Sequence, residues 1–399
     1  MHSLRILQLA TSTGGGAGIA ARRTHEALLE NNSDSTLITL TDYAKANKVF
    51  EIKRSRMDKL KSSALTAFQS YFFQSSDQLL TAVSRNSFKE QGVDISSYQV
   101  IHIHAYYNLL STRQIIDLCQ NHPEKRFFIT LHDERFLTGG CHYSQGCPNI
   151  LSGCKRCPQA TPLGGLYVGH DYTIKLKGLS SLGNLQLISP SRWLKELARV
   201  SPATQNLVCH VVRNPVPKVF FETKPPLSAA FPMRIAFVSA HLGTRMKGLT
   251  TLVGALNLIA AKGFSDSFEL VLVGQGEVPE FLDTRIKIEN LLSGTDEETA
   301  KILGTCQILA LPSIQDNLPS TMTEALCSGL SVVGTKIGGI NEILTAYNQV
   351  SVEPEDPHAF AEALLSLRTH QSTPLRSQAL SEFSYAAVAV RLLLIYNGE

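Results

Sequence analysis

The stretch Asp316–Gly329, DNLPSTMTEALCSG, decides the fold because it joins a predicted strand to a predicted helix. The apolar run Gln307–Leu311 precedes it, and Pro312 then ends the strand because proline cannot donate to a central ladder. The pair Pro319-Ser320 suits the first turn of a helix, and the final glycine suits the position after the last turn. The stretch therefore predicts a strand, a loop and the start of a helix.

Two acids punctuate this unit. Asp316 falls in the loop and Glu324 falls inside the helix. A helix N-terminus attracts phosphate through its free N–H groups and its dipole, whereas a carboxylate one turn deeper suits sugar hydroxyls. The alternative is that Thr321 and Glu324 form a capping box and that Asp316 is a turn residue.

Composition excludes several classes of protein. The chain has 399 residues, 43% of them hydrophobic, which is enough for two or three domains with cores of their own. The sequence contains no run of 18 apolar residues that would indicate a membrane span. The net charge of +3 is too small to indicate a nucleic-acid partner.

The N-terminal apolar run is too short for a secretory signal peptide and reads as a first strand. We therefore expect a cytoplasmic protein whose eight cysteines are thiols or metal ligands rather than disulfides.

Strand and helix patterns alternate along both halves. The apolar run Leu4–Ala10 leads into the loop Thr13–Gly18, which contains Gly15 and Gly16, and then into helical periodicity over Ile19–Leu29. Glycines at such a turn let the backbone approach a phosphate or sugar closely. Further strands are predicted at 35–40, 98–102, 127–131, 185–189, 207–212, 233–239, 268–273, 286–290, 307–311 and 331–335.

A proline-rich stretch from Arg213 to Pro232 has the composition of a linker between the halves. Each half repeats the strand–helix order of a doubly wound parallel sheet. The sequence thus predicts an α/β protein made of two Rossmann-like domains that face each other across a cleft.

Histidines mark the ends of two predicted strands in the first half. His132 and Asp133 directly follow the strand at 127–131, and ligands of open α/β sheets bind at the carboxyl ends of strands. His132 is therefore a candidate site residue. His102 and His104 alternate across a strand and are equally consistent with a structural, partly buried role.

Four cysteines follow within 17 residues, in the spacing C-x5-C-x6-C-x2-C. This density suits tetrahedral Zn²⁺, which would stiffen a long loop with little core of its own. An iron–sulfur cluster, labile disulfides and plain thiols are alternatives. The candidate ligands are Cys141, Cys147, Cys154 and Cys157.

A basic segment at 45–61 carries a charge of +5, and an aromatic run at 67–73 follows it. This combination is typical of peripheral contact with an anionic inner membrane surface. The alternative is a solvated basic helix face whose aromatic residues belong to the core.

Lys247 lies just before a predicted helix of the second half, where its ammonium group can meet a diphosphate. The alternative is an ordinary surface lysine.

Several motifs in a fixed order carry a resemblance to a known family. They are Lys247-Gly248, Pro312-Ser313, the acid-x7-Glu segment within Asp316–Gly329, and Thr335-x2-Gly338-Gly339-x2-Glu342. Together they resemble a retaining glycosyltransferase of the GT-B fold, family 4. The stretch Thr130–Gln159 is similar to a subgroup that makes bacterial surface polysaccharides, including the colanic-acid type.

The resemblance implies roles for the matching residues. Glu324 would bind the ribose hydroxyls of a nucleotide sugar, Asp316 would hold hydroxyls of the transferred sugar, and Lys247 would neutralise the diphosphate. His132 would lie over the sugar. Backbone amides would also contact the diphosphate, at Leu318, Ser320, Gly15 and Gly16.

Two departures from the family pattern concern charged residues. The family's first acid is usually glutamate, and here it is Asp316. An arginine expected near Leu242 is absent, and Arg245 is the candidate substitute.

The resemblance also assigns the domains and the partners. Residues 1–215, with a cysteine-rich insertion at 139–159, would form the acceptor side; residues 216–380 would bind the nucleotide sugar; and residues 381–399 would form a helix that crosses back. The donor would be a nucleoside diphosphate sugar and the acceptor a glycan or lipid-linked glycan, with no cofactor needed for catalysis.

Other functions remain as alternatives. One is a non-catalytic nucleotide-sugar sensor or scaffold, and another is a nucleotide-sugar epimerase of the same fold. A dehydrogenase fits least, because the glycine loop lacks the GxGxxG fingerprint.

Overall fold

The computed structural model describes residues 4–52, 60, 64, 93–224, 232–277, 280, 282–368 and 376–399. The chain divides into two compact units, Met1–Asn214 with Val388–Glu399, and Pro215–Ala387. The basic and aromatic segment at 45–73 lies outside the described residues from residue 53 onward, apart from residues 60 and 64.

The first unit contains a parallel sheet of seven strands, counted over the described residues, in the order β3-β2-β1-β4-β5-β6-β7. Alternate residues of its strands point to opposite faces, so Leu7, Ile101 and Phe127 join one apolar cluster, while Gln8 and His102 lie on the other face. The strands are β1 (Arg5–Ser12), β2 (Asp34–Thr41), β3 (Val49–Glu51), β4 (Val100–Ile103), β5 (Arg126–Thr130), β6 (Leu185–Ser189) and β7 (Cys209–Val211).

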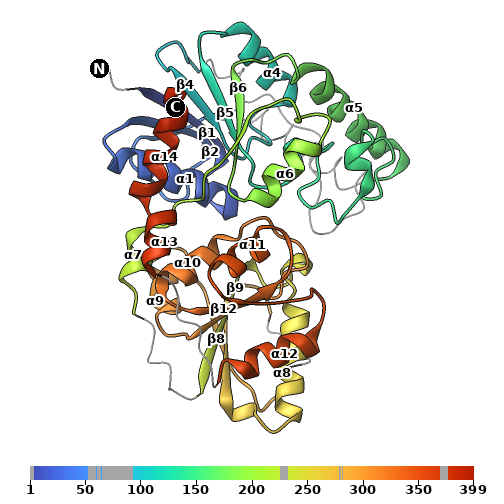
Figure 1. Ribbon diagram of the computed structural model, residues 1–399, viewed down its shortest axis with the longest axis vertical. Coiled ribbons are helices and arrows are strands. Elements are labelled where there is room, and N and C mark those ends of the chain that lie inside the picture. Colours follow the sequence, from blue (N-terminus) through green and yellow to red (C-terminus); the bar gives the residue numbers. More distant parts are fainter. Residues whose placement is uncertain are drawn as a thin grey trace. The chain divides into compact units, whose positions relative to one another are not determined.

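Helices follow most of these strands (Figure 1). The last helix of the chain returns to this unit, where the Tyr396 hydroxyl lies 2.6 Å from His102 Nδ1 and the Arg126 side chain donates to the Tyr396 carbonyl. The helices are α1 (Gly15–Glu30), α4 (Thr112–Asn121), α5 (Pro162–Gly178), α6 (Arg192–Val200) and α14 (Tyr385–Asn397), which begins in the second unit.

The second unit contains a parallel sheet of six strands in its described part, in the order β10-β9-β8-β11-β12-β13. Its strands are apolar on both faces: Ile235 and Leu270 join one cluster, while Ala236 and Val271 join the other. Such continuous apolar strands are typical of a parallel sheet covered by helices on both sides. The strands are β8 (Met233–His241), β9 (Phe268–Gln275), β10 (Lys287–Leu291), β11 (Ile308–Leu311), β12 (Ser331–Thr335) and β13 (Val350–Val352).

The helices of the second unit divide between the two faces of its sheet. Helices α8 (Leu249–Ala261) and α12 (Pro357–Ser366) pack together over one face (Figure 1). The opposite cluster draws on α7 (Lys218–Glu222), α9 (Asp296–Leu303), α10 (Ser320–Ser328), α11 (Gly338–Ala346) and α13 (Arg376–Phe383).

The predicted α/β class with two parallel sheets is confirmed. Two edge strands, β3 and β13, were not predicted, because each has only three residues and too little pattern to recognise. The first helix begins at Gly15 rather than after Gly18, so the glycines of this motif form the first turn of α1 instead of a separate loop.

Candidate active site

The second unit has a topological switch point between β8 and β11. Strand order runs outward in opposite directions from this pair, so the loops after the two strands diverge and leave a crevice at their carboxyl ends. The loop after β8 carries Lys247, and the loop after β11 carries Asp316. Topology alone therefore brings these two residues to one edge of the sheet.

Lys247 and Asp316 form an ion pair at this edge. The Lys247 ammonium donates to Asp316 Oδ2 at 2.6 Å, and the Asn317 amide donates to Oδ1 at 2.9 Å. The Lys247 side chain is 28% exposed and the Asp316 side chain is 10% exposed. The backbone amide of Asn317 thus holds the Asp316 carboxylate in place, and the partly exposed Lys247 ammonium can still be reached by a ligand.

Gly248 makes the close approach of the two loops possible. Its φ of +71° lies in the left-handed region, and a Cβ there would stand 1.8 Å from the Pro312 carbonyl oxygen. The Ile314 amide also donates to the Met246 carbonyl at 2.8 Å. The Lys-Gly and Pro-Ser motifs therefore fit against each other, which no side chain at position 248 would allow.

Helix α10 begins beside this pair. Pro319 is its N-cap, without a side-chain cap, and Gly329 ends it with φ of +88°. Because Thr321 lies inside the helix rather than at its cap, the alternative of a capping box with Glu324 is wrong. Glu324 lies one turn deeper than Ser320 and is 4% exposed.

A further pocket lies at the ends of β9 and β10. In its wall, the backbone of Gly274 packs directly against the Ser239 carbonyl oxygen, and a Cβ at position 274 would lie only 1.8 Å from that oxygen. The pocket is lined by Gly274, Gln275, Gly276, Asn290, Leu291 and Leu292. Its lining therefore combines two glycines with two amide and two leucine residues.

Arg245 does not join the Lys247–Asp316 pair. Its side chain is 63% exposed, and its guanidinium group lies 4.0 Å from Glu355. The geometry gives no support to its replacing the family's arginine.

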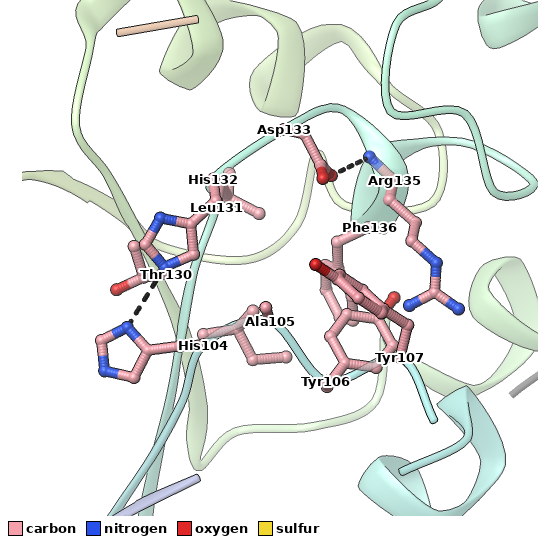
Figure 2. Close-up of a pocket in the computed structure, with 11 residues that line it drawn as sticks. His104, Ala105, Tyr106, Tyr107, Thr130, Leu131, His132, Asp133, Arg135 and Phe136 are labelled. Carbon is pink, nitrogen blue, oxygen red and sulfur yellow. Dashed lines mark hydrogen bonds between the residues drawn. The ribbon is translucent and has the colours of Figure 1, made fainter. Parts of the chain in front are cut away.

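The first unit has its own pocket at the carboxyl ends of β4 and β5 (Figure 2). His132 lines it, and its Nε2 lies 3.2 Å from Nδ1 of His104. Burial lowers the pKa of His132 to about 4, so this ring is neutral at physiological pH. The pocket therefore presents a neutral histidine and not an imidazolium.

Asp133 and Arg135 complete the wall of this pocket. Asp133 accepts a hydrogen bond from the Arg135 amide at 2.8 Å and lies 2.5 Å from His142 Nδ1. Burial raises the pKa of Asp133, but His142 and the Arg135 amide outweigh it and leave the pKa below its ordinary value. The Arg135 guanidinium lies over the Tyr106 ring at 4.5 Å. Sequence reasoning missed Arg135 and Tyr106, although their places just after strand ends were a signal.

The glycines after β1 play two different roles. A Cβ at Gly16 would meet no atom within 4 Å, and the same holds at Gly15, whose φ is +69°. A Cβ at Gly18 would lie 2.5 Å from the Ser12 carbonyl oxygen. Gly18 is therefore required for packing of α1 against β1, while Gly15 and Gly16 line open space.

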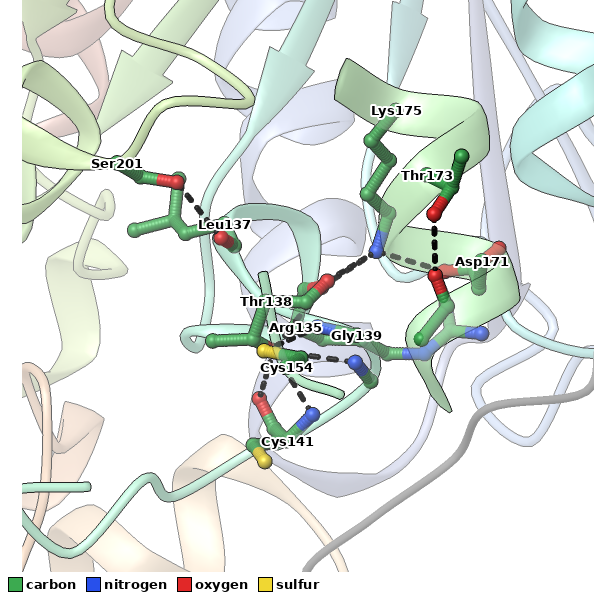
Figure 3. A network of polar contacts seen from close by, with 12 residues as sticks. Arg135, Leu137, Thr138, Gly139, Cys141, Cys154, Asp171, Thr173, Lys175 and Ser201 are labelled. Atoms are coloured by element: carbon green, nitrogen blue, oxygen red, sulfur yellow. Dashed lines mark hydrogen bonds and ion pairs between the residues drawn. The ribbon is translucent and has the colours of Figure 1, made fainter. Parts of the chain in front are cut away.

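Helix α5 and the cysteine-rich insertion contact the segment that forms part of the pocket wall (Figure 3). The fully buried Lys175 of α5 donates to the carbonyls of Arg135 and Thr138 at 2.9 and 2.6 Å and pairs with Asp171 at 2.8 Å. The Cys154 sulfur accepts from the Gly139 amide at 3.4 Å, and the Cys141 amide donates to the Thr138 hydroxyl at 2.9 Å. These contacts hold the segment that carries Arg135.

All four cysteines of the insertion are free thiols, and three of them share one small apolar cluster: Cys141, Cys154 and Cys157. The Cys141 thiol lowers the pKa of Cys157 to about 7, and the same contact raises the pKa of Cys141. Within the described residues, no group of three or more His, Cys, Asp or Glu side chains is placed to hold a metal ion. None of the described helices combines the length and the apolar content that spanning a bilayer requires.

Comparison with known sequences identifies the second unit. Residues 232–370 match the family described as "Glycosyl transferases group 1". Residues 232–370 therefore form a group 1 glycosyltransferase domain, family 4. The chain is thus a glycosyltransferase that moves a sugar from a nucleotide sugar, and the matched region contains Lys247, Asp316 and Glu324.

Curated relatives of this glycosyltransferase share low sequence identity. A colanic acid biosynthesis glycosyl transferase of Escherichia coli, WcaC, is 24% identical over 320 residues, which cover 75% of this chain and 73% of WcaC. The alpha-maltose-1-phosphate synthase of Mycobacterium tuberculosis is 26% identical over 254 residues, covering 54% of this chain and 63% of the relative.

Solved structures confirm the GT-B fold. Anabaena HepE, solved in complex with UDP and glucose, matches with a TM-score of 0.62 at 15% identity, covering 99% of this chain and 100% of HepE. WaaG, a glycosyltransferase involved in lipopolysaccharide biosynthesis, matches with a TM-score of 0.59 at 13% identity, covering 99% of this chain and 100% of WaaG.

Proposed function

We propose that this glycosyltransferase transfers a sugar, with retention of anomeric configuration, from a nucleoside diphosphate sugar to a hydroxyl of a glycan or lipid-linked glycan in surface polysaccharide synthesis. The relative WcaC, which is named for colanic acid biosynthesis, supports the role in surface polysaccharide synthesis. The ion pair between Lys247 and Asp316 at the switch point, next to the start of α10, is the observation that carries the proposal.

The diphosphate would lie at the start of α10. The amides of this helix start have no side-chain cap, and Ser320 follows Leu318 and Pro319 there. Lys247, 2.6 Å from Asp316, has one ammonium group that can contact the diphosphate and the sugar-binding acid together. As the bond between sugar and diphosphate breaks, negative charge grows on the diphosphate, and a fixed cation with aligned amides stabilises it.

Two carboxylates would hold the hydroxyls of the donor. Asp316 lies in the loop before α10 and would accept hydrogen bonds from the transferred sugar, while Glu324 lies one turn along the helix and would accept them from the ribose. The pocket at Gly274 and Leu292 would take the base, because its two glycines leave room for a flat ring and its amide and leucine residues offer polar and apolar contacts. In the proposed roles of the first unit, His132 would contact the transferred sugar, and the amides of Gly15 and Gly16 would contact the diphosphate.

A binding and transfer experiment tests this function. The purified chain is heated with UDP, GDP, ADP and dTDP, and a ligand at 100 times its Kd should add about 2.7 kcal/mol of stability. The sugar nucleotide of the best binder is then incubated with and without glycan acceptors, and release of the diphosphate is measured. Acceptor-dependent release supports transfer.

The other outcomes separate the alternatives. Conversion of the donor to another sugar nucleotide without any acceptor would show an epimerase. Binding without turnover on a broad panel of acceptors would favour a sensor, and no stabilisation by any of the nucleotides would overturn the proposal.

Two further features stay proposals. A zinc ion held by Cys141, Cys147, Cys154 and Cys157 would stiffen the insertion; the spacing of these cysteines is its basis, and the described side chains are not arranged to hold a metal ion. One zinc per chain in metal analysis would support it, and a ratio near zero would overturn it.

Peripheral contact with an anionic membrane would follow from a lipid-linked acceptor, and salt-sensitive binding to phosphatidylglycerol vesicles tests it.

A further inference from the structure

A line of hydrogen bonds runs through the interior of the first unit and ends at its pocket. His25 Nδ1 lies 2.9 Å from Ser35 Oγ, and Gln8 Nε2 lies 2.9 Å from the same hydroxyl. Gln8 Oε1 lies 2.9 Å from His104 Nε2, and His104 Nδ1 lies 3.2 Å from His132 Nε2. We call these five residues the histidine chain. All but His132 are at most 1% exposed.

A backbone carbonyl fixes the direction of the chain at its far end. His25 Nε2 lies 2.8 Å from the carbonyl oxygen of Asn47, which only accepts, so this nitrogen carries the hydrogen. Burial lowers the pKa of His25, so the ring is neutral and its Nδ1 must accept. The Ser35 hydroxyl therefore donates its single hydrogen to His25 and accepts from the Gln8 amide.

The same reasoning continues to the pocket. Since Gln8 donates through its nitrogen to Ser35, its oxygen faces His104 and requires a hydrogen on His104 Nε2. Burial holds the pKa of His104 well below its ordinary value, so its Nδ1 carries a lone pair. The hydrogen between His104 and His132 must then belong to His132 Nε2.

We propose that the histidine chain positions His132 for glycosyl transfer: His104, oriented by Gln8, fixes the Nε2-protonated tautomer of His132 and the orientation of its ring. The rings of His104 and His132 lie 5.5 Å apart and nearly parallel, at 27°. A neutral ring whose N–H points back into the protein has no second hydrogen for a ligand. Its Nδ1 is an acceptor, so it matches a hydroxyl-bearing sugar and not an anionic group.

The tautomer matters because the other tautomer would direct the ring N–H of His132 at the ligand, where a hydroxyl that donates a hydrogen bond would then find no acceptor. In hydrolases, loss of the group that fixes the histidine tautomer lowers kcat strongly although the geometry stays intact. His104 is accordingly a positioning residue and does not itself need to touch the substrate.

Two substitutions of His104 separate positioning from mere structural support. Asn places an amide oxygen near the position of Nδ1 and can still accept from His132, whereas Gln places its amide near Nε2 and leaves His132 without an acceptor. This test rests on the proposed transfer and on His132 as part of its site. We expect His104→Asn to keep kcat within about threefold and His104→Gln to lower it roughly tenfold or more, with a smaller change in KM for the donor. Equal kcat values for the two variants would overturn the proposal.

A spectroscopic readout does not depend on activity. In protein labelled with ¹⁵N-histidine, two-bond proton–nitrogen spectra report the tautomer of each ring, and the His132 signals are identified by their loss in His132→Gln. We expect the Nε2-protonated pattern for His132 in the wild-type chain and its loss in His104→Gln. If that variant does not fold, Gln8→Met makes the same test, because it removes the acceptor that orients His104.

The outcomes of the two experiments are distinguishable. An Nδ1-protonated His132 in the wild-type chain would overturn the histidine chain whatever the enzyme does. The expected tautomer in a protein that transfers no sugar would support the histidine chain and count against the proposed function alone.

Discussion

The two units build the carboxyl edges of their sheets from opposite chemistry. The second unit places a charged pair, Lys247 and Asp316, where a ligand can reach it, and its loop glycines bring the two charges to 2.6 Å. The first unit places a line of neutral, buried side chains behind His132, in a pocket whose wall also carries Asp133 and Arg135. The edge of the second unit is therefore suited to stabilise charge, whereas His132 in the first unit is suited to orient hydroxyls without adding a charge of its own.

This difference matches what each edge is proposed to bind. A departing diphosphate gains negative charge, and fixed cations and amides stabilise it most. A neutral sugar gains from directed hydrogen bonds, and these are precise only if the tautomer and rotamer of each partner are fixed. Substitutions at the two edges should therefore have different effects on kinetics and stability.

The largest effect should come from Glu324→Ala. If this carboxylate binds both ribose hydroxyls, losing charged hydrogen bonds of roughly 1.5–3 kcal/mol each lowers kcat/KM on the order of 10²-fold or more. Steady-state kinetics at fixed acceptor measure it. Glu362→Ala, which removes an exposed acid of the same unit, is the control. Near-wild-type turnover of the Glu324 variant would remove this residue from the site.

Lys247→Ala should lower kcat/KM by a similar or slightly smaller factor, on the order of 10²-fold, because one charge-assisted contact to the diphosphate is lost. The same steady-state kinetics measure this loss.

Asp316→Asn should reduce transfer more than nucleotide binding, since Asp316 is proposed to hold the sugar and not the nucleotide. Calorimetric titration with the nucleoside diphosphate, beside the transfer assay, distinguishes the two. A parallel loss of binding and transfer in Asp316→Asn would contradict the assignment.

The charged edge could be predicted from the sequence because its motifs are local. A strand ends just before Pro312, a helix ends just before Gly329, and Gly248 forms a left-handed turn. The order of these residues along the chain places Lys247 and Asp316 in the loops after two strands. Parallel-sheet topology then brings the two loops together. Strand existence was equally predictable, because central apolar runs differ clearly from their neighbours.

The neutral edge could not be predicted in the same way. Gln8, Ser35 and His104 come from three separated segments, and their contact depends on the register of neighbouring strands. A buried glutamine or histidine leaves no pattern of its own in a single sequence. The expectation of partly buried rings at His102 and His104 understated the result, because both are about 1% exposed.

A glycine pair tests whether the first unit's loop serves packing or binding. Gly18→Ala should destabilise the protein by about 1–3 kcal/mol, because the added Cβ meets the Ser12 carbonyl. Gly16→Ala adds its Cβ to open space within α1 and should change stability by no more than about 0.5 kcal/mol. Urea denaturation measures both. If the backbone of Gly16 approaches the diphosphate, its variant should still lower kcat/KM, and unchanged kinetics would remove it from the site.

A pH dependence of stability should also belong to the first unit. Burial lowers the pKa of His102 to about 3 in the folded chain, against 6.5 in an unfolded one. Below pH 6.5 the unfolded chain therefore binds a proton that the folded chain does not, and stability falls as pH falls, by about 1.4 kcal/mol per pH unit for each such ring. Above pH 6.5 the ring makes no difference.

The described histidines of the second unit, His241 and His358, are exposed, so replacing one of them serves as a control. His102→Gln should therefore flatten the fall in unfolding free energy between pH 6.5 and 5, whereas His358→Gln should leave it unchanged. Urea denaturation across that window decides between them. Equal slopes in both variants would mean that the ring of His102 takes up its proton without unfolding, and the neutral edge would then be far less rigid than its hydrogen bonds imply.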